Sequence, residues 1–162
     1  MPERLICIRN RQAADIDLCV QALATVHQAS GYPANWPADP ARWLTPSGSI
    51  RAWIATTNAL ATAGHVIVRR LPTSATGECT AEVSRLFVVP AARRQGIALA
   101  LLQETIHWAA ANELDLELEV TDQLRAARAV YERAGFRIVS TKRADWTTPD
   151  GQPVTLHRYA RR

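Results

Sequence analysis

Apolar residues recur along the chain with two different periods, and each period predicts one type of element. Alternation over short runs predicts strands, whereas apolar residues three or four positions apart predict helices. On this basis we expect strands at residues 5–9, 51–56, 65–70, 78–89, 114–120, 136–144 and 154–159. We expect helices at residues 13–29, 96–111 and 124–134, and a short further helix that starts near Asp39 and Pro40.

Glycines and prolines mark the ends of these elements. Gly31 follows the first helix and Gly135 ends the last one, as expected for residues that close helices. Pro90 has no N–H group to donate to a sheet, so it stops the fourth strand. Turns are expected at residues 71–77 and 149–151, where proline and glycine cluster.

The order of the predicted elements indicates an α/β (α+β) fold with a mixed sheet. Three strands linked by hairpins precede a strand–helix–strand crossover. This crossover makes the fourth and fifth strands parallel, and the connection between them should be right-handed. No linker or internal repeat divides the chain, so residues 1–162 are expected to form one domain.

Strict two-residue alternation in the fourth strand assigns its side chains to two faces. One face carries Glu82, Ser84, Leu86 and Val88, and the other carries Val83, Arg85, Phe87 and Val89.

Composition and charge exclude several classes of protein. No apolar run approaches the roughly 20 residues of a membrane helix, so no membrane association is expected. The N-terminus, Met1 to Arg4, leads into a strand-like run rather than a signal-peptide core, which indicates a cytoplasmic protein. The three cysteines lack metal-ligand spacing and are expected to be buried free thiols, and the histidines form no metal motif, so no metal is expected.

The net charge of +4 comes mostly from scattered arginines. They form no basic stripe with interleaved aromatic residues, so nucleic acid is not an expected partner. A small anionic ligand such as a phosphorylated cofactor fits this charge better.

The segment from Leu86 to Ala98 joins a strand to a helix through a short basic loop. Unpaired N–H groups at a helix start can bind phosphate, and Gly96 would let a pyrophosphate approach the main chain closely. Arg93 and Arg94 add positive charge. The alternative is an ordinary helix start with solvated arginines.

A second informative segment runs from Tyr131 to Phe136. It places a tyrosine near the end of a short helix, before a glycine and a strand. A tyrosine in this position can be catalytic, or it can simply pack in the core.

The two segments read RxxGxA over 93–98 and YExxGF over 131–136, and together they resemble the GNAT superfamily of acetyl-CoA-dependent N-acetyltransferases. The resemblance implies a mixed, splayed sheet of about seven strands flanked by about four helices. It also implies acetyl-CoA as cosubstrate and a primary amine as acceptor.

The resemblance implies roles for the matching residues. The main chain of Leu86, Phe87 and Val88 would pair with the pantetheine arm, and an N–H group near Val88 would stabilise the oxyanion. The pyrophosphate would be held by Arg93, Arg94, Gln95, Gly96, Ile97 and Ala98. Tyr131 would protonate the departing thiolate. Leu124 stands seven residues before Tyr131, where many relatives have an asparagine that contacts the cofactor.

A general base is needed because the amine must lose a proton. Glu82 on the fourth strand matches the position of a glutamate that many family members use. Glu119 on the fifth strand is the rival, since some relatives that acetylate protein N-termini use that position. The alternative for each residue is a surface glutamate in a salt bridge.

The acceptor is expected to lie between the loop at 31–49 and the hairpin at 145–153. Candidate wall and charge residues there are Tyr32, Trp36, Trp43, Trp146, Asp39, Asp145 and Asp150. The size and aromatic content of the loop favour a small-molecule amine. A protein or peptide N-acetyltransferase, or a non-catalytic acyl-CoA-binding module, is the alternative, and a homodimer through the last strands is open.

Overall fold

The computed structural model describes residues 5–71 and 79–162. The expected turn at 71–77, apart from its first residue, and the start of the fourth strand at Glu78 lie outside the described residues, as do Met1 to Arg4. The strands are β1 (Cys7–Asn10), β2 (Ser49–Thr56), β3 (Gly64–Arg70), β4 (Thr80–Val88), β5 (Asp115–Thr121), β6 (Arg137–Thr147) and β7 (Pro153–Arg161). The helices are η1 (Ala13–Asp15), α1 (Ile16–Ser30), α2 (Pro40–Trp43), η2 (Pro90–Ala92), α3 (Ile97–Ala111) and α4 (Arg125–Arg133).

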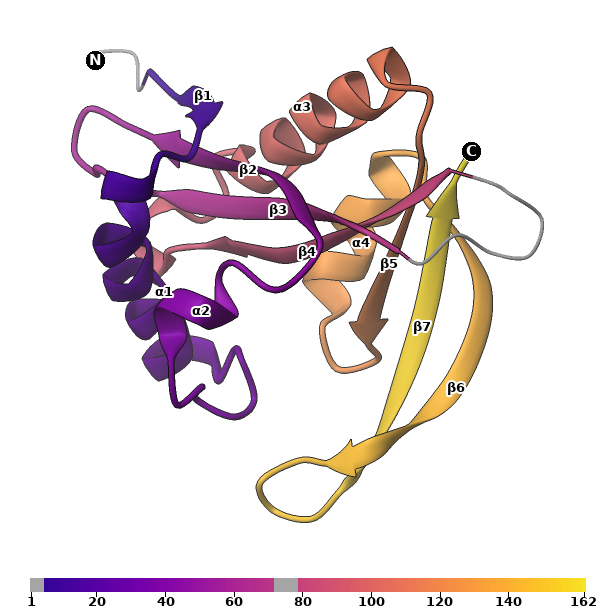
Figure 1. The fold of residues 1–162 in the computed structure, drawn as a ribbon. Helices are drawn as coiled ribbons and strands as arrows, with labels where there is room; N and C mark the ends of the chain where they lie inside the picture. The colour runs from indigo at the N-terminus through magenta and orange to yellow at the C-terminus, as the bar shows by residue number, and fades with distance from the viewer. Residues whose placement is uncertain (1–4, 72–78) are drawn as a thin grey trace.

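The described strands form one seven-stranded sheet in the order β1-β2-β3-β4-β5-β7-β6, which Figure 1 shows with its helices. Neighbouring strands are antiparallel except β4 and β5, which are parallel and joined through α3. The predicted mixed sheet and its parallel pair are therefore confirmed. The sequence pattern did not indicate that β7 would lie between β5 and β6.

Strands β4 and β5 pair over only three positions and then separate. Their pairing runs from Thr80 opposite Asp115 to Glu82 opposite Glu117. Beyond that point β5 pairs with β7 on its other side, while β4 turns away from it (Figure 1). The sheet is therefore splayed, as the family resemblance implies.

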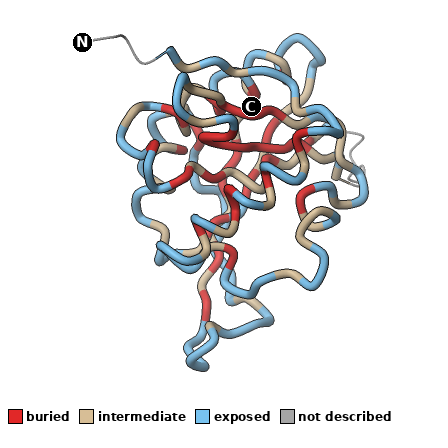
Figure 2. The backbone as a smooth tube through the Cα atoms, turned by 90° about the vertical axis from the view of Figure 1, so that its left-hand side faces the viewer, coloured by how far each residue is buried: buried red, intermediate tan, exposed pale blue. Residues whose placement is uncertain are grey.

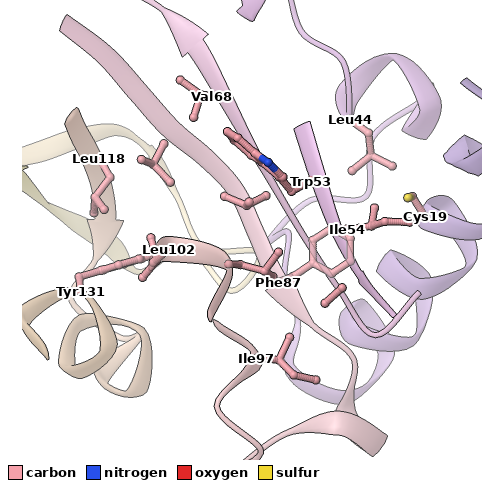
Figure 3. Close-up of a cluster of buried hydrophobic side chains, with 14 of the residues drawn as sticks. Cys19, Leu44, Trp53, Ile54, Val68, Phe87, Ile97, Leu102, Leu118 and Tyr131 are labelled. Atoms are coloured by element: carbon pink, nitrogen blue, oxygen red, sulfur yellow. The ribbon is translucent and has the colours of Figure 1, made fainter. Parts of the chain in front are cut away.

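Helices cover both faces of the sheet, and the core lies where α3 crosses β2, β3 and β4. A Cβ atom on Gly64 of β3 would come within 2.9 Å of Ile97 and 3.0 Å of Leu101 on α3, so only glycine allows this close approach. Figure 3 shows the side chains packed in this core. In Figure 2 the buried positions follow the central strands, and the β6–β7 hairpin projects from them with an exposed tip.

Helix α1 forms because apolar side chains at helical spacing meet the sheet. Cys19, Leu23 and Val26 are buried on one side of it. The helix ends as predicted at Gly31, whose φ of 70° is the left-handed conformation that glycine adopts without a Cβ penalty.

A β-bulge in β4 overturns the strict alternation expected for that strand. Ile67 of β3 lies opposite Ser84, but His65 lies opposite Phe87, so β4 carries one extra residue between these pairs. Opposed residues share a face, which places Ser84 and Phe87 together. The expected common face of Glu82, Ser84, Leu86 and Val88 is therefore wrong beyond Ser84. Arg85, within the bulge, has a φ of +54°.

The expectation of buried thiols holds for one cysteine. All three cysteines are free; Cys19 is buried, but Cys7 and Cys79 are exposed. Both exposed residues lie next to the ends of strands, where an apolar residue need not face the core. In the described parts of the chain, no helix is long and apolar enough to cross a bilayer.

Candidate active site

The loop between β4 and α3 presents main-chain groups to open space. Two residues in it, Arg94 and Gly96, have positive φ angles of 61° and 77°, a conformation that turns successive N–H groups into one concavity. Gly96 immediately precedes α3 and is exposed, and a Cβ atom there would meet no atom within 4 Å. The start of α3 is thus accessible to an anion.

Side chains around this loop have different environments. Arg93 and Arg94 are exposed, and Arg93 donates from Nη2 to Ser30 Oγ at 3.0 Å, which ties the loop to the end of α1. Ile97 is buried and can therefore offer only its main chain to a ligand. Gln95 and Ala98 are half-buried at the loop and the first turn of α3.

The edge of β4 that faces β5 is open beyond Glu82. Among the described strands none pairs with this edge along Leu86, Phe87 and Val88. Phe87 is buried and stacks on His65 with ring centroids 5.1 Å apart, whereas Leu86 and Val88 are half-buried. An extended ligand could therefore pair with the main chain here as an added strand would.

Tyr131 lies on α4 and retains 8% of its surface exposed. Figure 3 shows its side chain reaching from α4 toward Leu102 of α3. Its hydroxyl makes no hydrogen bond with a described residue, and its ring contacts those of Phe136 and Tyr159, each 6.3 Å away between centroids. Burial raises the pKa of Tyr131 well above its usual value, and Tyr32 raises it further. The phenol is protonated at neutral pH, as a tyrosine with its ordinary pKa also would be, and the raised pKa extends this state into alkaline solution.

Both candidate bases are held in ion pairs. Glu82 Oε1 accepts from Arg69 Nε at 2.9 Å, at the last paired position before β4 and β5 separate. Glu119 Oε1 lies 3.2 Å from Lys142 Nζ and 3.5 Å from Arg158 Nη2. To act as a base, each carboxylate would have to accept a proton from the amine of the substrate while it remains in contact with a cationic side chain.

A polar network at the bulge of β4 was not predicted from the sequence. His65 Nε2 lies 2.8 Å from Nη1 of Arg11, and its Nδ1 lies 2.9 Å from the carbonyl oxygen of Arg85. A guanidinium only donates and a carbonyl only accepts, so the ring is neutral with its proton on Nδ1. Burial lowers the pKa of His65 to about 3, which agrees with a neutral ring. No short motif around this residue signals such a role.

A model of a known protein family matches residues 22–136, and its description is acetyltransferase (GNAT) family. The matched range includes the loop before α3, the separated strands and Tyr131. The chain belongs to the GNAT acetyltransferase family. It is an acetyl-CoA-dependent acetyltransferase by this membership, and the resemblance seen in the sequence is confirmed. A search of curated proteins found no match.

Several solved structures share the GNAT fold of this chain. NAA60 from Arabidopsis thaliana, in complex with acetyl-CoA, has a TM-score of 0.77 at 18% identity, covering 97% of this chain and 98% of that one. The ribosomal-protein-S18-alanine N-acetyltransferase from Escherichia coli has a TM-score of 0.76 at 21% identity, covering 96% and 92%. A GCN5-related N-acetyltransferase from Kribbella flavida has a TM-score of 0.76 at 24% identity, covering 96% of each chain.

On the α1 face of this GNAT domain, part of the expected aromatic wall comes together. Tyr32 contacts Trp43 edge-on with centroids 6.0 Å apart, and the guanidinium of Arg85 lies 4.1 Å over the Trp43 ring. Trp36 is 40% exposed, and its ring contacts that of His27 on α1 instead. Trp146 is exposed on β6, away from these contacts.

The structure also shows the surroundings of the expected acidic residues and of Leu124, the position where many relatives have an asparagine. Asp39 accepts a hydrogen bond from the Arg42 N–H group and so begins α2. Asp145 is exposed on β6, and Asp150 accepts from the Thr148 hydroxyl in the turn of the hairpin. Leu124 packs against the core before α4. In the described ranges no three His, Cys, Asp or Glu side chains come together to hold a metal ion.

Proposed function

We propose that this GNAT protein transfers the acetyl group of acetyl-CoA directly to the primary amine of a small molecule in a ternary complex. The observation that carries the proposal is the open start of α3 at Gly96, beside an unpaired edge of β4. The start of α3 offers main-chain N–H groups to the pyrophosphate of coenzyme A. The adjoining edge of β4 offers main-chain groups to its pantetheine arm.

The loop residues fit a pyrophosphate by their chemistry. Gly96 leaves room for close approach to the main chain, and the helix start adds partial positive charge. Arg93 and Arg94 would contribute charge, while Gln95, Ile97 and Ala98 would contribute main-chain N–H groups. Leu86, Phe87 and Val88 would pair with the pantetheine arm through their main chain.

Tyr131 is the proposed acid and Glu82 the proposed base, with Glu119 as the rival base. The base, directly or through a water molecule, takes a proton from the amine, whose nitrogen then forms a bond to the acetyl carbon. An N–H group near Val88 stabilises the oxyanion. The carbon–sulfur bond breaks and Tyr131 protonates the sulfur, so that coenzyme A leaves as the thiol.

A protein or peptide N-terminus is the second candidate acceptor. The relative from Escherichia coli is named for a ribosomal protein that it acetylates, and it shares the fold at 21% identity. The aromatic content of the loop, in which Tyr32 and Trp43 meet edge-on, supports the small-molecule acceptor. The presence of Tyr131 and of a candidate base, Glu82, argues against a non-catalytic acyl-CoA-binding module.

The test joins a binding measurement to a turnover measurement on the full chain. Calorimetry with acetyl-CoA should give a saturable signal, and incubation with acetyl-CoA and a panel of amines should release free thiol. Binding without thiol release from any amine or peptide would favour the acyl-CoA-binding module. Absence of binding would reject the proposal altogether.

Cellular location, domain organisation and assembly remain predictions. We expect a cytoplasmic protein in which residues 1–162 act as one domain. A homodimer through the exposed strand β6 is the expected assembly if one forms, and sedimentation would measure it.

A further inference from the structure

Arg85 carries a half-buried positive charge that forms no ion pair with a described carboxylate, although Glu82 favours its charged form from a greater distance. Its Nε donates to the carbonyl oxygen of Trp43 at 3.1 Å, and its Nη1 donates to Ser84 Oγ at 3.0 Å. Both acceptors are neutral. The other N–H groups of its guanidinium have no acceptor among residues 5–71 and 79–162. Arg69, on the neighbouring strand β3, is instead paired with Glu82, which lies opposite it.

A charge withdrawn from water without a counter-ion is unfavourable. Burial is the main cause that lowers the pKa of Arg85. A second half-buried guanidinium, that of Arg11, contacts the same segment after α2 through the Leu44 carbonyl and the Thr45 hydroxyl. Two guanidiniums thus donate to neutral groups of residues 43–45, and an anion bound beside Arg85 would supply the ion-pair partner that Arg85 lacks.

The backbone at Arg85 is also in an unfavourable conformation for its residue type. Its φ of +54° favours glycine, because a Cβ atom crowds the following carbonyl. The hydrogen bond from His65 to the Arg85 carbonyl holds this conformation. A residue other than glycine in such a conformation is a reason to look for a function of its side chain.

Arg85 lies beside the proposed reaction site. It immediately precedes Leu86, the first of the residues proposed to pair with the pantetheine arm. Burial raises the pKa of Tyr32 to about 12, and the charge of Arg85 opposes this shift; burial, and then Tyr32, raises the pKa of Tyr131. The geometry also joins Arg85 to Tyr32, because the Arg85 guanidinium lies 4.1 Å over the Trp43 ring and Tyr32 meets that ring edge-on with centroids 6.0 Å apart.

We propose that the acceptor is a small molecule that carries a carboxylate close to its primary amine, as a free amino acid does, and that Arg85 binds this carboxylate. This inference rests on the proposed function and names its substrate class. A planar guanidinium can bind both oxygens of a carboxylate. A peptide N-terminus has an amide in the place of that carboxylate and would leave the charge of Arg85 without a partner.

The test compares three acceptors that share one side chain: the amino acid, its amide, and the amine without the carboxyl group. The comparison is repeated over the common side chains, and free thiol release gives kcat/KM for each acceptor. We expect the acid to exceed the amide and the amine by about 10- to 100-fold, the range for a charge-assisted hydrogen bond.

Two variants assign this preference to one residue. Arg85→Gln should remove the preference by slowing the reaction of the acid alone, while its Kd for acetyl-CoA stays at the wild-type value. Arg51→Gln is the matched control, because Arg51 also lies over a tryptophan, Trp53, at 5.9 Å, but on the α3 face of the sheet. This control should keep the preference.

Equal turnover of acid and amide by the wild-type protein would overturn the inference, and this measurement does not depend on whether a variant folds. A preference that persists in Arg85→Gln would overturn it as well. In both cases acetyl transfer itself is observed and the proposed function stands. If no amine releases thiol, the proposed function and this inference fail together.

Discussion

His65 donates its Nδ1 proton to the carbonyl oxygen of Arg85 across 2.9 Å, at the point where β4 bulges. Nε2 of the same ring accepts a hydrogen bond from Arg11. Arg11 also donates to the carbonyl oxygen of Leu44, which follows α2. One neutral imidazole therefore links β3, the bulge of β4 and the segment that follows α2. The geometry of the open β4 edge depends on these contacts.

Stability should decrease in mildly acidic solution because His65 stays neutral in the folded protein. Its pKa is about 3 when folded and about 6.5 when unfolded, so the unfolded chain binds an extra proton as the pH falls below 6.5. This contribution is complete above pH 6.5 and is lost progressively toward pH 3. Between pH 7 and pH 5 it should lower the free energy of unfolding by about 2 kcal/mol, measured by urea denaturation.

The variant His65→Asn tests the origin of that decrease. Its side-chain amide can still donate to the Arg85 carbonyl but does not titrate, so the variant should lose less stability over the same pH interval. Asp15, whose pKa is lowered to about 2 mainly by its hydrogen bond with Arg9, changes stability only below about pH 3.8 and does not interfere. Identical pH dependence in both proteins would contradict the neutral imidazole.

Removing the Tyr131 hydroxyl should slow acetyl transfer without weakening acetyl-CoA binding. The variant Tyr131→Phe keeps the ring that packs among Phe136 and Tyr159 but cannot donate a proton. We expect kcat to fall roughly 10²- to 10⁴-fold. Because the pKa of Tyr131 is raised, wild-type kcat should also persist into alkaline solution rather than decline near pH 10.

Tyr159→Phe is the matched control for this experiment. Its hydroxyl donates to Glu132 at 3.1 Å and accepts from Arg128, so removing it should cost about 1 kcal/mol of stability. It should leave kcat unchanged. Equal kcat values for Tyr131→Phe and the wild-type protein would remove Tyr131 from the role of acid.

A methyl group at Gly96 should weaken acetyl-CoA binding. The φ of 77° makes Gly96→Ala unfavourable by roughly 1–2 kcal/mol in the folded state, and the new Cβ atom would occupy the open space in front of α3. We expect the Kd measured by calorimetry to rise at least about tenfold. Gly151→Ala carries a similar backbone penalty, at φ 85°, in the β6–β7 turn, and should bind acetyl-CoA normally.

The two candidate bases can be separated by neutral substitutions that keep their shape. If Glu82 is the base, Glu82→Gln should lower kcat/KM roughly 10²-fold or more across the accessible pH range, measured by thiol release. Glu119→Gln should then reduce it far less, although both variants break an ion pair. The reverse order of effects would assign the role to Glu119.

Much of this molecule follows from local sequence. Pro90 ends β4, Gly96 precedes α3 and Gly135 follows α4, because the conformations that these residues allow are set by their own covalent structure. Periodic apolar residues located the described strands and helices α1, α3 and α4 within a few positions, whereas the short helix η2 was not predicted. The proposed pyrophosphate loop and the proposed acid Tyr131 could be singled out because each is carried by a short, continuous segment.

Only the tertiary structure decided the features that depend on residues distant in sequence. The extra residue in β4 becomes visible when His65 is found opposite Phe87, since a bulge is defined by its partner strand. Likewise, the isolated charge of Arg85 and the paired charges of Glu82 and Glu119 depend on neighbours from other elements. Local propensity acts through covalent geometry within a few residues, whereas burial and charge pairing arise only when distant segments pack together.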